Sequence, residues 1–122
     1  MKKIRVGVAG YGTIGQRLAD GVAMQEDMEL VGVADLAPTL SVRALFEKGM
    51  PYDLYLAEGA DSAALDAQGI PITGTFQDLL GKVDIMLDSS PGGVGAKKPA
   101  DPGWPQGLRP DTVYLQGWGF PR

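Results

Sequence analysis

The apolar and polar positions of the first 35 residues predict a strand, a helix and a second strand. Residues 4–9 are apolar or small nearly throughout, as in a parallel strand that is covered on both faces. A helix over about 13–24 is expected next, because apolar side chains recur every fourth residue on one face, at Ile14, Leu18 and Val22. A second apolar run then ends at Asp35. This order is typical of a strand–helix–strand unit with an acidic residue at the tip of its second strand.

The pattern after residue 35 predicts shorter elements of both kinds. Helices are expected over 40–48, over 61–68 and after Thr75, and strands over 52–56, 83–88 and 112–115. In the first of these helices, the side chains expected to face the core are Val42, Leu45 and Phe46. Right-handed crossovers would lay the strand over 83–88 in the same parallel sheet as the first two. The predicted fold class is therefore α/β, with a doubly wound, Rossmann-like and mostly parallel sheet.

The residues between the first strand and the first helix form a glycine motif, Gly10-Tyr11-Gly12-Thr13-Ile14-Gly15. Gly10 would let the chain leave the strand through a tight turn, and Gly12 would let a pyrophosphate lie against the main chain. Gly15 would let the first helical turn pack closely on the strand. The free N–H groups at the helix start, together with the helix dipole, favour a negatively charged ligand.

The context of this motif carries more weight than the motif alone, because 18 glycines in 122 residues produce chance patterns. The motif follows a strand and opens a helix, and Asp35 lies 20 residues beyond Gly15. At that spacing a carboxylate can accept hydrogen bonds from an adenosine ribose. The alternative is a Gly-rich turn in an α/β protein that binds no nucleotide. We predict a nucleotide site.

A second Ser/Gly-rich segment, residues 89–95, follows the strand over 83–88. In an open α/β sheet, ligands bind in the crevice outside the carboxyl ends of the strands, and such a segment can approach a nucleotide without steric bulk. The alternative is a turn with no special chemistry. Asp88 either caps the amides of this loop or contacts the ligand.

Composition narrows the choice of function. The net charge of −4 argues against a nucleic-acid partner, which calls for a basic face. Cysteine and histidine are both absent, so the chain offers no thiolate metal site and no Cys or His catalyst; no catalytic and no metal-binding residue is assigned. No run is long enough to span a membrane and no leader precedes the first strand, so a cytoplasmic location is expected.

The chain is expected to divide into a nucleotide-binding domain, residues 1–96, and a divergent Pro/Gly/Trp-rich tail, residues 97–122. Proline recurs every third residue over 99–105, which excludes a helix there. The run over 112–115 is the last strand predicted.

The glycine motif and residues 91–97 (Pro-Gly-Gly-Val-Gly-Ala-Lys) together resemble archaeal-type (type II) phosphorylating glyceraldehyde-3-phosphate dehydrogenase. The resemblance covers residues 2–97. It implies an enzyme of sugar metabolism that oxidises and phosphorylates glyceraldehyde 3-phosphate with NAD or NADP, as a cytoplasmic homotetramer. The partner of this chain would be a small-molecule nucleotide. By the resemblance, the residues that contact the cofactor beside Asp35 are Gly10, Gly12, Thr13, Ile14, Gly15, Ser90, Pro91 and Gly117.

The chain departs from that family in three respects. The catalytic cysteine and its domain are absent, and residues 97–114 cannot form the family's helix. We therefore expect a truncated, nucleotide-binding part with a reading-frame error near residue 97, inactive on its own. Asp35 replaces a basic or neutral residue, and its charge would repel the 2′-phosphate of NADP, so NAD is expected to be preferred.

Two other interpretations stay open at this stage. One is a stand-alone nucleotide-binding module or sensor without catalysis. The other is an aspartate-semialdehyde or dihydrodipicolinate reductase type with a similar opening motif, against which the segment over 91–97 argues.

Overall fold

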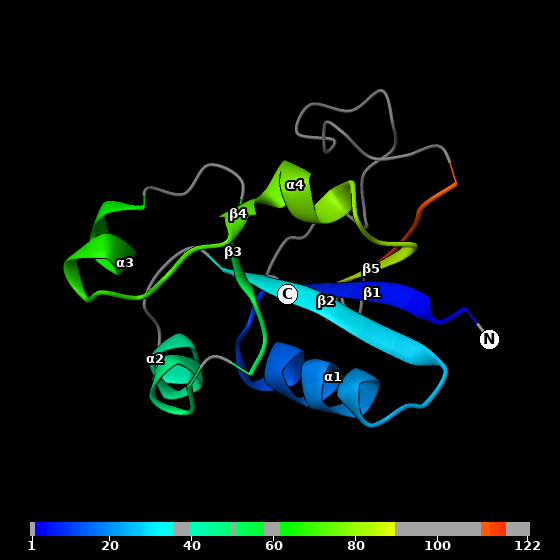
Figure 1. Ribbon diagram of the computed structural model, residues 1–122, viewed down its shortest axis with the longest axis horizontal. Coiled ribbons are helices and arrows are strands. Elements are labelled where there is room, and N and C mark those ends of the chain that lie inside the picture. The colour runs from blue at the N-terminus through cyan, green and yellow to red at the C-terminus, as the bar shows by residue number, and fades with distance from the viewer. Residues whose placement is uncertain (1, 36–39, 50, 58–61, 90–110, 117–122) are drawn as a thin grey trace, which may run out of the picture.

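The computed structural model describes residues 2–35, 40–49, 51–57, 62–89 and 111–116 (Figure 1). The helices and strands follow in the order β1 (Ile4–Ala9), α1 (Thr13–Ala23), β2 (Met28–Asp35), α2 (Leu40–Glu47), β3 (Leu54–Leu56), α3 (Ala63–Ala67), β4 (Gly74–Thr75), α4 (Phe76–Leu80), β5 (Ile85–Asp88) and β6 (Val113–Gln116). Each element predicted from the sequence is found, with ends that differ by a few residues. The largest shifts are two residues: β3 begins at Leu54, α3 at Ala63 and β5 at Ile85, where starts at residues 52, 61 and 83 were expected.

The strands form one sheet of six strands in the order β4-β3-β2-β1-β5-β6. Every neighbouring pair is parallel. The doubly wound, Rossmann-like sheet predicted from the sequence is therefore confirmed. The chain leaves β1 toward β2 and later returns to the other side of β1 as β5, so the strand order reverses at β1. A sheet of this kind binds ligands at such a reversal, outside the carboxyl ends of the strands.

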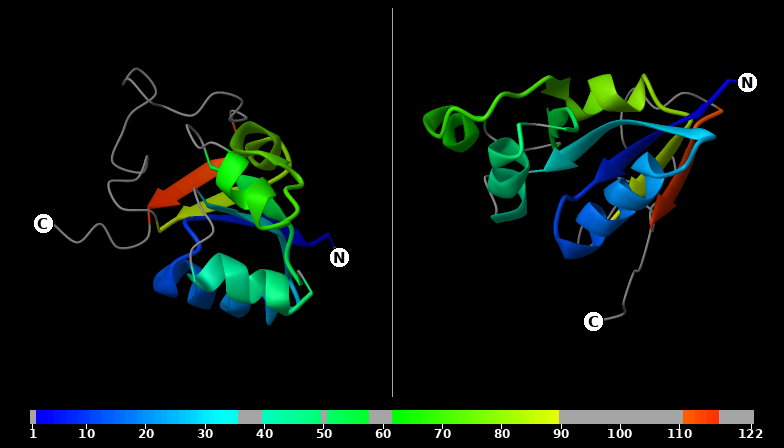
Figure 2. Two further views of the ribbon diagram at one scale, coloured as in Figure 1. Left: turned by 90° about the vertical axis from the view of Figure 1, so that its left-hand side faces the viewer. Right: turned by 60° about the horizontal axis from the view of Figure 1, so that its bottom comes forward.

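Helices cover both faces of the sheet (Figure 2). On one face, Val8 and Val33 of the sheet pack with Ala19 of α1 and with Val42 and Leu45 of α2. On the other face, the side chains that pack against α4 include Ala34, Tyr55 and Met86. These two apolar layers hold β1, β2 and β5 in place.

The expected burial of Phe46 is wrong, because this side chain is 40% exposed. Val42 and Leu45 of the same helix are buried as predicted. A helix of eight residues presents only a narrow stripe to the sheet, and positions 42 and 45 lie three residues apart on that stripe. Phe46 lies about 40° from Val42 on the side away from Leu45, and about 100° from Leu45, so it falls at the edge of that stripe.

The helix predicted after Thr75 begins with a complete capping box. Thr75 Oγ1 accepts a hydrogen bond of 3.2 Å from the Asp78 N–H, and Asp78 Oδ2 accepts one of 2.8 Å from the Thr75 N–H. These bonds satisfy two backbone donors that a helix start otherwise leaves without partners. They also hold the pKa of the Asp78 carboxyl below its ordinary value.

Candidate functional site

The candidate site lies where the loop after β1 meets the ends of β2 and β5. β1 ends at Ala9 and α1 begins at Thr13, so the connection is short. Gly10 has a φ of +83°, a conformation that side chains resist. Its N–H donates a hydrogen bond of 2.8 Å to the Ala34 carbonyl oxygen of β2. The tight turn predicted at Gly10 is thereby present and tied to the neighbouring strand.

The first turn of α1 packs directly on this turn of the loop. A Cβ at position 15 would lie 1.7 Å from the Gly10 carbonyl oxygen and 2.9 Å from Ser89 Oγ. Only glycine fits there, which agrees with the close packing predicted for Gly15. The start of α1 is consequently held against the ends of β1 and β5.

Gly12, by contrast, faces open space. It caps the N-terminus of α1 without a side-chain hydrogen bond, and an added Cβ would meet nothing within 4 Å. The first turn of α1 carries no acidic side chain that would repel an anion. The backbone at Gly12 is therefore accessible to a ligand at a helix N-terminus, which is the chemistry that a phosphate group calls for.

Ile14 does not share the buried face of α1. The residue is 39% exposed, whereas Ala19 is fully buried and Val22 is buried. Helix α1 approaches the sheet through Gly15 and Ala19, and Ile14 is turned away from that contact. Thr13 is the first residue of α1, and its side chain lies outside the described residues.

Asp35 is the last residue of β2, and its carboxylate reaches the glycine loop. Asp35 Oδ2 accepts a hydrogen bond of 2.9 Å from the Tyr11 N–H, although the two residues are 24 positions apart. The acidic residue predicted at the strand tip is thus brought to the loop that precedes α1. It links β2 to the candidate site.

Ser89 is the first residue of the Ser/Gly-rich segment that the sequence placed near the ligand, but its contact with the glycine loop was not predicted. It follows β5, and its Oγ donates to the carbonyl oxygens of Gly10 at 2.7 Å and Ala9 at 3.1 Å. The parallel register, in which Ala9 pairs with Asp88, places the first residue after β5 beside the first residue after β1. Knowledge of that pairing would have identified Ser89 from the sequence.

Asp88 is buried next to the site, at 1% exposure. Its Oδ2 accepts a hydrogen bond of 2.8 Å from the Tyr114 hydroxyl, which belongs to β6. One role of this carboxylate is therefore to join the end of β5 to Tyr114 of the neighbouring strand β6. The sequence left two roles open for Asp88, a cap on the amides of the following loop and a contact with the ligand. That loop, from residue 90 on, lies outside the described residues.

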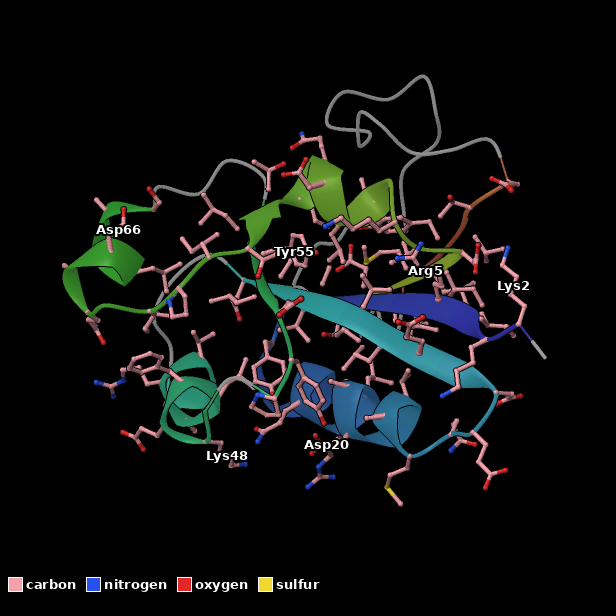
Figure 3. All side chains as sticks on the ribbon, viewed as in Figure 1. Lys2, Arg5, Asp20, Lys48, Tyr55 and Asp66 are labelled. Carbon is pink, nitrogen blue, oxygen red and sulfur yellow. The ribbon has the colours of Figure 1, made fainter. Side chains whose placement is uncertain are left out.

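Two tyrosines, Tyr11 of the glycine loop and Tyr52 before β3, interact with Asp20 of α1. Tyr11 packs in the core with Val42, and burial followed by the charge of Asp20 raises the pKa of its hydroxyl. The Tyr52 hydroxyl donates a 2.7 Å hydrogen bond to Asp20 Oδ1, and burial and this bond raise the pKa of Tyr52 to about 12. Figure 3 shows Asp20 on α1, below the sheet, and Tyr55 beside the sheet on β3. Tyr11 and Tyr52 are therefore protonated, structural groups at neutral pH.

Ser90, Pro91 and Gly117, which the sequence assigned to the cofactor site, lie outside the described residues. In the part of the chain that is described, no group of three or more His, Cys, Asp or Glu side chains could hold a metal ion. Over the same residues, none of the helices combines the length and the apolar character that a membrane crossing requires.

Comparison with known proteins finds similarity to curated dehydrogenases. The chain is 46% identical over 92 residues to a glyceraldehyde-3-phosphate dehydrogenase of Methanobacterium formicicum, covering 75% of this chain and 27% of that protein. It is 43% identical over 100 residues to that of Methanosarcina mazei, covering 81% and 29% respectively. It is 45% identical over 95 residues to the glyceraldehyde-3-phosphate dehydrogenase of Pyrococcus abyssi, covering 78% of this chain and 28% of that protein. The chain thus spans less than a third of these relatives. No protein-family model matches it.

Proposed function

The chain is homologous to the N-terminal portion of archaeal glyceraldehyde-3-phosphate dehydrogenases, and on that premise we propose that it holds NAD(P) for such an enzyme. The observation that carries the proposal is the loop between β1 and α1. At that loop an open glycine backbone, a helix N-terminus and the carboxylate of Asp35 lie together.

Each part of the loop fits one part of a dinucleotide. The N–H groups at residues 12–15 would bind the pyrophosphate, because they point out of a helix N-terminus and Gly12 leaves their approach open. The cofactor would be contacted by Gly10, Gly12, Thr13, Ile14, Gly15, Ser90, Pro91 and Gly117.

Asp35 would accept hydrogen bonds from the ribose hydroxyls of the adenosine half. A carboxylate at this position favours NAD, since it would repel the additional phosphate of NADP. We therefore propose NAD as the preferred cofactor. The bond from the Tyr11 N–H fixes the carboxylate at the loop before any ligand is present.

A bound nicotinamide cofactor would supply hydride acceptance in the oxidation of an aldehyde. The residues of this chain contribute position and orientation to that reaction, and the chain contains no cysteine to act as the nucleophile of the family. Residues 1–96 would form the nucleotide-binding domain and residues 97–122 a tail that adds β6. The phosphorylating dehydrogenase activity, the homotetramer and the cytoplasmic location are proposed for the full-length protein.

The proposal is tested by titrating the chain with NAD and with NADP in a calorimeter at one ionic strength. We expect NAD to bind more tightly than NADP. The Gly12→Ala variant is expected to lose most of this affinity while keeping its fold, because its methyl group would occupy the ligand's approach. Equal heats from wild type and variant, or no binding of either dinucleotide, would contradict the proposal.

A second candidate function is nucleotide binding without catalysis, as a module or sensor. The absence of both cysteine and histidine from the sequence favours it. The two candidates differ in turnover. NADH formation from glyceraldehyde 3-phosphate and phosphate, in proportion to the amount of chain added, would exclude the second candidate.

A further inference from the structure

The peptide group between Gly10 and Tyr11 is hydrogen-bonded at both of its ends. Its carbonyl oxygen, on Gly10, accepts a bond of 2.7 Å from Ser89 Oγ. Its N–H, on Tyr11, donates a bond of 2.9 Å to Asp35 Oδ2. Ser89 follows β5 and Asp35 ends β2, and these strands flank β1 on opposite sides. Two neighbouring strands thus hold one peptide group between them.

Holding both ends of a peptide group fixes its orientation. The group is a rigid plane whose C=O and N–H point in opposite directions when the bond is trans, as it is here. Rotation of this plane would change ψ of Gly10 and φ of Tyr11 together. It would also redirect the N–H groups that follow, at the start of α1. The two side chains therefore control the direction of the amides at the candidate site.

Such control is needed because the loop backbone has little stiffness of its own. Gly10, with a φ of +83°, lacks the Cβ that restricts other residues. Gly12 is exposed and has open space around it. Beside the backbone bond from the Gly10 N–H to the Ala34 carbonyl oxygen, the side-chain hydrogen bonds of Ser89 and Asp35 add order that the glycines do not supply.

We propose that Ser89 is a positioning residue for nucleotide binding, which acts with Asp35 by holding the Gly10–Tyr11 peptide. This inference rests on the proposed function. The Ser89 hydroxyl touches no nucleotide and works through the backbone of the loop. Its effect on affinity comes from preorganisation, because a loop that is already ordered loses less conformational freedom on binding.

The first measurement is amide hydrogen exchange by NMR on the ligand-free chain. In Ser89→Ala the Tyr11 N–H is expected to exchange roughly three- to tenfold faster, since the loss of one hydrogen bond loosens the shared peptide plane. Ser89 makes no bond to that N–H, so a role confined to the end of β5 would leave its exchange unchanged. Ser62→Ala is the matched control, because Ser62 forms no side-chain cap on α3 and lies outside the site. Unchanged exchange at Tyr11 in Ser89→Ala would overturn the inference.

The second measurement is the affinity of the same variants for ADP and NAD. Ser89→Ala is expected to weaken both ligands by about three- to tenfold, and Ser89→Thr, which keeps a hydroxyl, is expected to restore both readouts. Equal behaviour of the Ala and Thr variants would overturn the role of the hydroxyl. Faster exchange with unchanged affinity would overturn the role in binding. Failure of the wild type to bind either ligand would instead refute the proposed function, and the exchange result would remain as a separate readout on the peptide.

Discussion

The carbonyl oxygen of Gly10 occupies the position that a side chain on Gly15 would need, 1.7 Å from an ideal Cβ there. Three residues earlier, Gly12 has no atom within 4 Å of its own ideal Cβ. Two glycines of one motif therefore serve different ends. Gly15 is required for the packing of α1 on the loop, and Gly12 leaves space for a ligand.

This contrast predicts opposite results for two alanine substitutions. Gly15→Ala is expected to lower the free energy of unfolding by at least about 2 kcal/mol, because the new methyl group displaces backbone atoms. Gly12→Ala is expected to change it by less than about 1 kcal/mol, the scale of N-cap preferences. Urea denaturation monitored by circular dichroism measures both. Similar destabilisation by the two substitutions would refute the distinction.

Asp35→Asn is expected to move the cofactor preference toward NADP. The substitution removes the negative charge and keeps an oxygen that can accept the Tyr11 N–H, so the loop should stay ordered. The ratio of NAD to NADP affinity should fall by roughly tenfold, the equivalent of about 1.4 kcal/mol. Calorimetric titrations provide the ratio, with Asp66→Asn on the exposed surface of α3 as the control. A ratio equal to that of wild type would show that Asp35 does not select the cofactor.

Tyr52 is expected to titrate late, with a pKa of about 12. Because the folded state raises this pKa above the usual value of 10.0, the neutral hydroxyl stabilises the fold. That contribution is complete below pH 10 and is lost as the pH rises through about 12. The ultraviolet absorbance of phenolate follows the titration. Tyr52→Phe should reduce the amplitude of the late step, to which Tyr11 with its raised pKa also contributes, and Asp20→Asn should shift the step to lower pH. An amplitude that is unchanged in Tyr52→Phe would contradict the assignment.

The capping box of α4 predicts a pH-dependent stability. Asp78 has a lowered pKa, chiefly because its carboxylate accepts the Thr75 N–H, so its contribution is complete above the pKa of the unfolded chain. It is lost as the pH falls through the lower folded value, in the range below about pH 4. Thermal unfolding of wild type and Asp78→Asn at neutral and acidic pH should therefore converge on acidification.

The cap itself can be tested with Thr75→Ala at neutral pH. Removal of the Oγ1 acceptor is expected to cost about 1 kcal/mol, the usual loss for a threonine N-cap. Ser62→Ala at the start of α3 provides the comparison, because Ser62 forms no side-chain cap there. Equal losses in the two variants would argue that the Thr75 hydroxyl does not cap α4.

Local patterns were sufficient to predict most of the elements and the glycine turn. The strand at Ile4–Ala9 and the helix after it depend on residues that are close in sequence, and so does the cap at Thr75. The contact of Ser89 with the glycine loop escaped prediction because its partners, Gly10 and Ala9, are about 80 positions away and meet it only through strand pairing. Phe46 was placed wrongly for a related reason. Apolar character alone does not show where a short helix will touch the sheet.

The contacts that complete the candidate site span most of the chain, since Ser89 and Gly10 are 79 positions apart. The site therefore exists only in molecules where β5 has already docked beside β1. By mass action, a ligand that binds this state and not the unfolded chain stabilises the fold by RT ln(1 + L/Kd), where L is the free ligand concentration, so the melting temperature rises with L. A dinucleotide would thus stabilise the folded chain, and the rise in melting temperature would measure how strongly it favours the molecules in which β5 is docked beside β1.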